Sequence, residues 1–183
     1  MEVRGSIITS IDSFVKDTHP NEYEKWVSNL SDSTKELMKR PTSSKWYPIE
    51  DGVLHPTKVM CDLFYKDPKE GAWQSGRYSA KAGLTGIYKV FVLISTPAFL
   101  MKRASRILAT FYTPTEVAVM DSTDHSMVVH FTVLPTSNLY LEYRIAGWME
   151  QALEICGCKD LSLRITQSIA NGDKLFEVQI SWR

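Results

Sequence analysis

The residues best suited to hold a metal ion or to carry out redox chemistry are scattered along this chain. No histidine stands with another histidine, a cysteine or a carboxylate at the spacing of a structural zinc site; the histidines are His19, His55, His125 and His130. Cys156-Gly157-Cys158 lacks the two-residue gap of redox and zinc cysteine pairs, and the remaining cysteine is Cys61. The sequence therefore predicts no metal site.

Other catalytic patterns are missing from the sequence as well. The glycines at positions 71, 76, 83 and 86 fit neither the phosphate-binding loop nor the dinucleotide fingerprint, and helix packing explains them more simply. No serine lies in a nucleophile-elbow pattern, and no carboxylate pair can be placed in one cleft. A basic stripe at helical spacing could hold an acidic partner or a ligand carboxylate, or simply face solvent; it consists of Lys102, Arg103 and Arg106. We predict no catalytic residues and favour a non-enzymatic protein.

Large aromatic side chains and small residues gather in the middle of the sequence. Rings beside small residues either fill a core or line an apolar cavity, and the two outcomes share one sequence pattern. Under the second interpretation, the residues expected to line a ligand pocket are Trp73, Tyr78, Tyr88, Phe91, Phe99, Tyr143 and Trp148. An ordinary filled core is the simpler alternative.

Helical periodicity dominates residues 1–112, the part of the chain that precedes any clear hairpin. A short strand or extended arm is expected over residues 3–9, and Trp46 to Glu50 is interpreted as a connector. Helices are expected where apolar residues recur at three- and four-residue spacing, with breaks at proline or glycine; they cover residues 11–15, 23–30, 31–40, 53–64, 68–95 in two pieces joined near Thr85, and 96–112.

After residue 112 the apolar spacing changes from helical to alternating. Hairpins are expected over residues 117–133 and 161–182, the second turning at Asn171-Gly172-Asp173. Between them a helix is expected to open after Pro135 and to end at Gly157. The predicted fold class is α/β (α+β), with N-terminal helices packed on a four-stranded antiparallel sheet and an inserted helix between two C-terminal hairpins. We expect a single domain over residues 1–183, with a mainly helical half (1–112) and a hairpin-helix-hairpin half (113–183).

Composition limits the environment and the partners of the chain. Lys plus Arg and Asp plus Glu each number 21, so no net field draws the protein to nucleic acid. Three cysteines are too few for a disulfide framework, which points to a reducing compartment. The first residues lack the apolar run of a signal peptide, and no window approaches a membrane span. The sequence thus predicts a cytoplasmic protein without an integral membrane segment.

Several motifs resemble those of a known family. They are Trp46-Tyr47-Pro48, Gly76-Arg77-Tyr78-Ser79-Ala80, Gly86-Ile87-Tyr88-Lys89-Val90-Phe91, Thr96-Pro97-Ala98-Phe99-Leu100, Gly147-Trp148 and Gly172-Asp173. Together they resemble a myxococcal paralogous family of uncharacterised bacterial proteins. The order of elements is similar to a wider superfamily of 4-vinyl reductase domains, transport-particle subunits and haem-dependent nitric-oxide sensors. This resemblance implies an α/β fold with a buried pocket between sheet and helices, and often a dimer.

The chain departs from the wider pattern at positions that carry chemistry in some members. Many 4-vinyl reductase domains have cysteines on both sides of the glycine-aspartate turn, where this sequence has Ser168 and Phe176. The haem-dependent relatives use an axial histidine in a helical context that none of the four histidines here reproduces. We therefore expect no cofactor, with haem or another tetrapyrrole as the alternative.

Three functional hypotheses follow from the residues and the resemblance. The first is a non-enzymatic sensing or regulatory domain, acting in signalling, that holds a small apolar molecule between the central helices and the sheet. The second is a homodimeric scaffold or interaction protein that uses an exposed helix face. The third is an accessory factor in tetrapyrrole reduction or haem binding, which rests on analogy with the superfamily.

Overall fold

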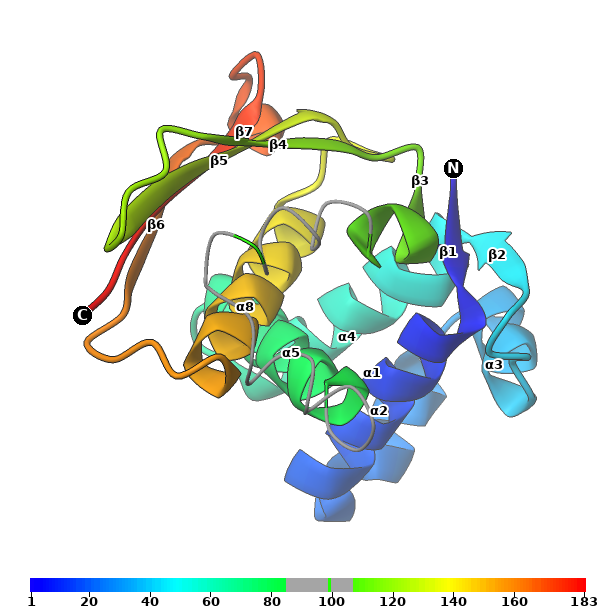
Figure 1. The fold of residues 1–183 in the computed structure, drawn as a ribbon. Helices are drawn as coiled ribbons and strands as arrows, with labels where there is room; N and C mark the ends of the chain where they lie inside the picture. The colour runs from blue at the N-terminus through cyan, green and yellow to red at the C-terminus, as the bar shows by residue number, and fades with distance from the viewer. Residues whose placement is uncertain (85–98, 100–106) are drawn as a thin grey trace.

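A curved antiparallel sheet arches over a layer of helices (Figure 1). The computed structural model describes residues 1–84, 99 and 107–183. The sheet contains β4 (Glu116–Met120), β5 (Ser126–Val133), β6 (Ser162–Gln167) and β7 (Phe176–Ser181), in the order β4-β5-β7-β6. The predicted fold class is confirmed: both hairpins and the helix between them are present.

The alternation of side chains along the two central strands separates a buried face from an outer face. Val129 on β5 pairs with Val178 on β7, and the rings of the next inward pair, Phe131 and Phe176, lie 4.9 Å apart between their centroids. Residues between these positions point to the other side of the sheet. There the cross-strand neighbours His130 and Glu177 form a hydrogen-bonded pair with 2.8 Å between Nε2 and Oε2.

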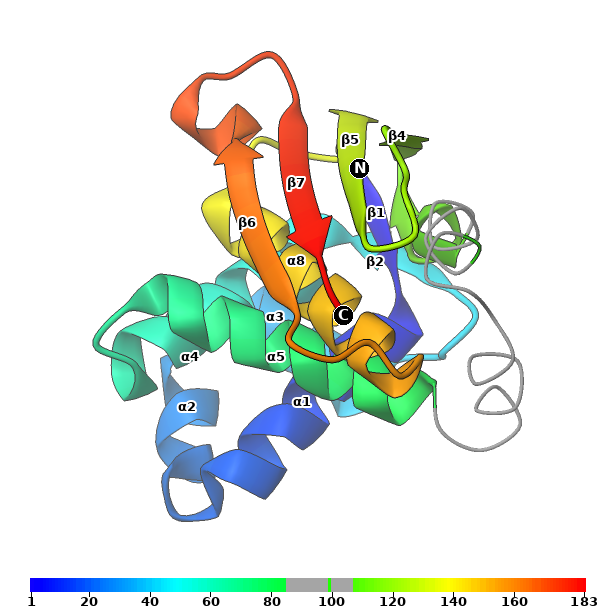
Figure 2. The same ribbon diagram turned by 60° about the vertical axis from the view of Figure 1, so that its left-hand side comes forward.

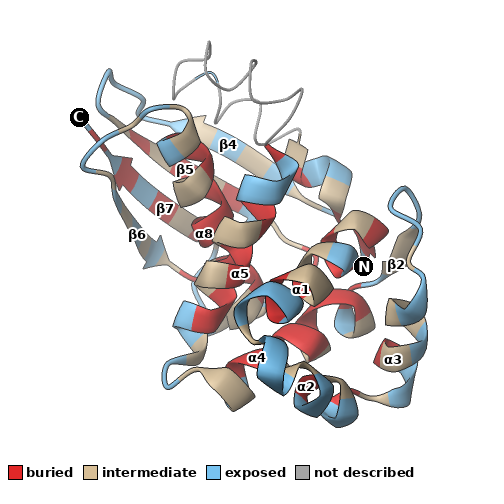
Figure 3. Cartoon of the chain, turned by 90° about the horizontal axis from the view of Figure 1, so that it is seen from below, coloured by how far each residue is buried: buried red, intermediate tan, exposed pale blue. Residues whose placement is uncertain are grey.

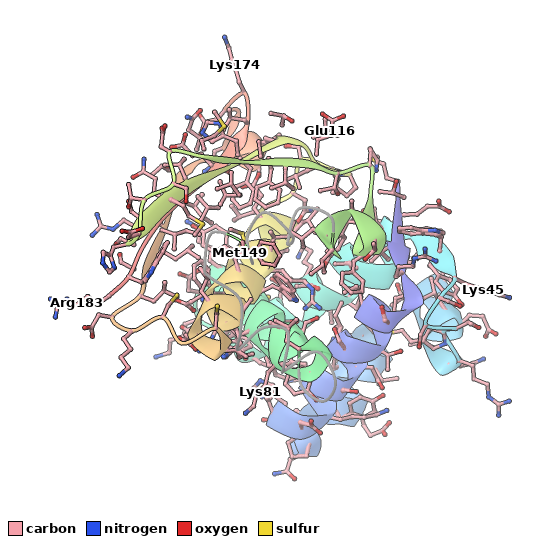
Figure 4. All side chains as sticks on the ribbon, in the orientation of Figure 1. Lys45, Lys81, Glu116, Met149, Lys174 and Arg183 are labelled. Carbon is pink, nitrogen blue, oxygen red and sulfur yellow. The ribbon has the colours of Figure 1, made fainter. Side chains whose placement is uncertain are left out.

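The helix α8 (Leu139–Ile155) lies between the sheet and the other helices, as Figure 2 shows. Asn138 caps its start, because the side-chain oxygen accepts a hydrogen bond from the amide of Tyr140 at 2.9 Å. The helix ends just before Gly157, whose φ of 99° places it in the left-handed region where glycine is favoured. Burial extends around much of α8 (Figure 3), and Met149 lies beneath the sheet, 1% exposed (Figure 4).

The helix α5 (Pro68–Gly83) crosses α8 at very short range, because each helix presents a glycine to the backbone of the other. A Cβ atom added to Gly76 would lie 1.9 Å from the carbonyl oxygen of Arg144. One added to Gly147 would lie 2.1 Å from the carbonyl oxygen of Trp73. At the edge of the crossing, the Arg77 guanidinium binds the carboxylates of Glu150 and Glu154. α5 ends at Gly83, close to the break expected near Thr85, and the second helix expected before residue 95 lies outside the described residues.

The remaining helices surround α5 and largely follow the predicted breaks. They are α1 (Gly5–Thr18), a 3-10 turn η1 (Pro20–Glu22), α2 (Tyr23–Asn29), α3 (Asp32–Lys39), a π-helical turn η2 (Glu50–Leu54) and α4 (His55–Phe64). Ser31 caps α3 by accepting a hydrogen bond from the amide of Thr34 at 3.2 Å. Residues 107–111 are helical as well. None of the helices in residues 1–84 and 107–183 is both long and apolar enough to cross a bilayer.

A second, small sheet differs from what the sequence predicts. It has the order β2-β1-β3, with β1 (Glu2–Arg4), β2 (Trp46–Pro48) and β3 (Tyr112–Thr113). The expected arm over residues 3–9 is wrong beyond Arg4, because α1 begins at Gly5. Likewise, the predicted connector at Trp46 contains a strand. Strands of two or three residues leave too short an alternating pattern to detect, since their stability comes from partners distant in sequence.

The turn of the second hairpin is tied to α8 by a buried carboxylate. After β6, the 3-10 turn η3 (Ile169–Asn171) ends at Gly172, which has a φ of 97°. The carboxylate of Glu142 on α8 accepts hydrogen bonds from the Ser168 hydroxyl at 2.5 Å and from the Ala170 amide at 2.9 Å. This contact fixes the end of the sheet on the helix.

Candidate functional site

An apolar cavity of about 440 Å³ opens among the helices, beside the places where the described chain stops at Leu84 and resumes at Ile107. Its walls come from the first turns of α1, the last turn of α5, the helical segment 107–111 and one residue of α8. The lining residues are Ser6, Ile7, Thr9, Ser10, Ser79, Ala82, Gly83, Leu84, Ile107, Thr110, Phe111 and Trp148.

The cavity wall combines apolar side chains with a few hydroxyl groups. Ile7, Leu84 and Trp148 are each less than 10% exposed and provide hydrophobic surface. Ser10 and Ser79 place their hydroxyls 3.2 Å apart, and Ser10 also donates to the carbonyl of Ile7 at 2.9 Å. Such a wall suits a ligand with an apolar body and a small number of polar atoms.

A buried arginine lies behind this pair of hydroxyls. Arg144 on α8 is 1% exposed, and its Nη2 donates to the Ser10 hydroxyl at 2.9 Å. Its Nη1 donates to the hydroxyl of Ser75, and its Nε has no hydrogen-bond partner among the described residues. Arg144 forms no ion pair with a carboxylate in residues 1–84 or 107–183. A guanidinium group is charged at any physiological pH, so this side chain is a buried cation.

A void of about 10 Å³ lies beside Arg144, next to the cavity wall. Four residues border both spaces: Ile7, Ser79, Phe111 and Trp148. A space of this size accommodates about one water molecule or one ligand oxygen. The inner end of the apolar cavity is thus polar and positively charged.

The structure separates the aromatic residues that the sequence grouped into a pocket. Trp148 lines the cavity. Trp73 and Tyr143 instead pack against each other, with 6.1 Å between ring centroids, and the Trp73 indole donates to Glu150 at 2.7 Å. The side chain of Phe99 is 47% exposed. Tyr88 and Phe91 lie outside the described residues, as do the basic stripe residues 102, 103 and 106.

Tyr78 also points away from the cavity, toward α1. Its ring lies 5.5 Å from that of Phe14, and its hydroxyl donates to the carboxylate of Asp17. The bond to Asp17, together with burial, raises the pKa of Tyr78 to about 12. Tyr78 therefore stays protonated and holds α5 to α1.

Sequence reasoning missed Arg144 and the hydroxyls that it binds. A signal was present, because residues 141 and 148 are apolar and lie three and four positions from 144, on the same helix face. A charged residue on the apolar face of a helix is uncommon and indicates either an ion pair or a site. The serine partners gave no such signal, since they come from α1 and α5.

The potential metal ligands lie apart from the cavity. His19 stacks on Phe64 with ring centroids 4.3 Å apart, and the Nε2 of His55 accepts a hydrogen bond from the amide of Ser31 at 3.0 Å. Cys61 is fully buried under α5, and this burial raises the pKa of its thiol to about 12. Within the described part of the chain, no three histidine, cysteine or acidic side chains come together as a metal site would require.

Solved structures share this fold over nearly the whole chain, although no family model and no curated protein matches the sequence significantly. An Fe(II) unliganded H-NOX protein from K. algicida has a TM-score of 0.72 at 12% identity, covering 98% of this chain and 96% of that one. An H-NOX protein from S. oneidensis in the Fe(II)NO ligation state has a TM-score of 0.73 at 10% identity, covering 98% and 99%. A third, from work on haem redox potential and porphyrin distortion, has a TM-score of 0.67 at 14% identity, covering 98% and 95%. The chain has the fold of H-NOX proteins.

Proposed function

We propose that this protein is a sensing or regulatory domain that binds a small apolar molecule in the cavity between α1, α5, α8 and residues 107–111. The observation that carries the proposal is the cavity of about 440 Å³, which falls within the ordinary size range of ligand sites. The fold supports it, since solved structures with this fold were captured in ferrous and ferrous-NO states. The resemblance to the myxococcal paralogous family stays a prediction beside it.

Haem is the cofactor that the structural neighbours suggest, but the donor groups at this cavity do not fit it. Haem iron in proteins is held by an axial side chain such as histidine or a cysteine thiolate. None of the described residues that line the cavity is histidine, cysteine, methionine or tyrosine. Residues 85–106 contain neither histidine nor cysteine; Tyr88 and Met101, which they do contain, lie outside the described residues. The described cavity wall therefore favours a ligand that needs no bond to a metal.

A haemin titration separates the two ligand classes. We expect addition of haemin to the purified protein to give no saturable 1:1 complex with the sharp visible bands of axially ligated haem. If such bands appeared at one equivalent, haem would become the proposed ligand in place of a metal-free molecule. That result would also support the accessory role in tetrapyrrole reduction or haem binding.

The cavity itself can be tested by filling it. We expect organic extraction of the purified protein, followed by mass spectrometry, to yield a small apolar molecule. Ser6→Phe, which places a ring in the cavity, should lower the recovered amount roughly tenfold, the change that a loss of about 1.4 kcal/mol in binding produces. Ser28→Phe on the exposed surface of α2 is the matched control and should retain the molecule. Equal recovery from both variants would show that the molecule binds elsewhere.

The homodimer is a prediction that is independent of the ligand proposal. It requires a mass of two chains in solution at micromolar concentration, measured by light scattering. A monomer would leave the ligand proposal unchanged and would count against the alternative of a homodimeric scaffold.

A further inference from the structure

Among the described residues, Arg144 is a buried cation without an anion. Its guanidinium is bound by two serine hydroxyls from different helices, while its Nε has no hydrogen-bond partner in residues 1–84 or 107–183. Neutral hydroxyls satisfy hydrogen bonds but do not balance charge, and an uncompensated charge in an apolar interior is strongly unfavourable. Arginine side chains in proteins do not become neutral by losing a proton, so the unfavourable free energy of the buried charge remains.

The rest of the chain offers no carboxylate to complete the pair. Arg144 has no acidic partner among the residues that the structure describes. Residues 85–106, the main stretch outside them, contain four basic residues and no acidic residue. The nearby Glu142 is occupied on the other side of α8 by Ser168 and Ala170. The missing negative charge must therefore come from outside the chain.

The route from outside leads through the cavity. The void beside Arg144 shares four wall residues with the apolar cavity, and Ser10 both receives the bond from Arg144 and lines that cavity. The void is large enough for one oxygen atom, and its surroundings beyond Arg144 and Ser79 are mainly apolar. An anion that reached this point would leave its apolar remainder in the larger cavity.

We infer that the ligand is an amphiphilic monocarboxylate, whose carboxylate pairs with Arg144 at the Ser10–Ser79 end while its hydrocarbon part fills the cavity. This inference rests on the proposed function and adds the chemical class of the ligand. Arginine favours carboxylates because its planar fork matches their geometry. The serine hydroxyls, already placed around the guanidinium, can rotate to donate to the carboxylate oxygens.

Decanoic acid and decan-1-ol form a matched pair of probes, because they differ mainly in the head group. Isothermal titration calorimetry near neutral pH, where the acid is ionised, should show decanoate binding to the wild-type protein at least tenfold more tightly than the alcohol. Arg144→Gln should reduce this preference to within about twofold, because it weakens binding of the acid far more than binding of the alcohol. Arg164→Gln, which removes an exposed arginine on β6, is the charge-matched control and should keep the full preference.

The possible outcomes distinguish failure of the carboxylate inference from failure of the proposed ligand-binding function. If the wild-type protein binds the alcohol as tightly as the acid, the carboxylate inference fails and the apolar site stands. If neither probe binds, the proposed function fails with it. The wild-type comparison needs no variant, so it remains decisive even if Arg144→Gln does not fold. In that case Ser79→Ala, which removes one hydroxyl from the same end, should weaken binding of the acid severalfold and binding of the alcohol less.

Discussion

Glu142 and Arg144 stand two positions apart on α8, and both are buried, yet they face different layers of the molecule. Successive residues of a helix are turned by about 100°, so side chains two positions apart point to nearly opposite sides. The carboxylate of Glu142 reaches the hairpin turn at Ser168, whereas the guanidinium of Arg144 reaches α1 and α5. One helix thus carries a buried anion toward the sheet and a buried cation toward the cavity.

Removing the Glu142 carboxylate should loosen the end of the sheet. Glu142→Ala leaves the Ser168 hydroxyl and the Ala170 amide without their acceptor, and we expect a loss of about 1–3 kcal/mol in the free energy of unfolding. Urea denaturation followed by circular dichroism measures the loss. The same substitution at the exposed Glu36 is the control and should change stability by less than about 0.5 kcal/mol. If the two substitutions lowered stability equally, the buried Glu142 carboxylate would not stabilise the end of the sheet.

The same carboxylate gives a pH dependence with a definite sign. Burial raises the pKa of Glu142 above 4.5, so the native protein keeps the proton in a range where the unfolded chain has released it. The associated stability is present below pH 4.5 and is lost as the pH rises through the native pKa. Glu142→Gln cannot release a proton, so its stability relative to wild type should increase from about pH 4 toward neutrality. A pH-independent difference between the two would contradict the raised pKa.

The three cysteines should differ in reactivity because they differ in burial. The thiol of Cys61 is fully buried with a pKa of about 12, so we expect iodoacetamide at neutral pH to modify it at least about a thousandfold more slowly than a free cysteine. Cys156 and Cys158 are half-buried at the end of α8 and should react first, although burial raises the pKa of both. Peptide mass spectrometry after timed alkylation shows the order. Early labelling of Cys61 in the folded protein would disprove the burial.

At the scale of the elements, the glycines in the crossing of α5 and α8 allow the helices to approach. Gly76→Ala would drive a methyl group into the carbonyl of Arg144, and the helices would have to separate. We expect a loss of about 1–3 kcal/mol or more, measured by chemical denaturation. Gly83→Ala on the same helix meets no atom of the described residues within 4 Å and should be neutral or stabilising by up to about 1 kcal/mol. If both variants were equally stable, the close crossing would be wrong.

The sequence predicted the elements whose signals are local and missed those whose signals are not. Ser31, Pro41 and Gly157 end or begin helices by their own backbone chemistry, so the boundaries near them were predictable. The alternating residues of β5 and β7 revealed both hairpins. The small sheet was invisible, because each strand has only two or three residues and pairs with segments more than 40 positions away.

The candidate site was less predictable than the fold for the same reason. The sequence indicated an apolar pocket with aromatic walls, and Trp148 does line the cavity. Trp73 and Tyr143 carry the same sequence signal but face another surface, since helical spacing alone does not say which neighbour covers which side. The polar end of the cavity depends on hydroxyls from α1 and α5 that contact Arg144. Contacts between segments so far apart in sequence leave no pattern within any one segment, so the sequence alone could not predict them.

For the whole molecule, the close packing of α8 on α5 predicts that the two halves depend on each other. Residues 113–183 expressed alone would expose the face of α8 that carries Arg144 and Gly147, both of which contact α1 or α5. We therefore expect this fragment to show no cooperative thermal transition by circular dichroism, while the full chain shows one. A cooperative transition in the fragment would divide the chain into two domains and would contradict the single-domain prediction.

Because β1 lies at the centre of the small sheet, its two neighbours can pair with it only after they have been synthesised. Val3 is synthesised before both of its partners, because it pairs with Tyr47 on one side and with Tyr112 on the other. During synthesis this strand therefore keeps its second edge uncovered until the chain has been made as far as Tyr112. Deletion of residues 1–4 should accordingly affect folding yield more strongly than the length of the deleted segment would suggest, because both neighbouring strands lose their partner.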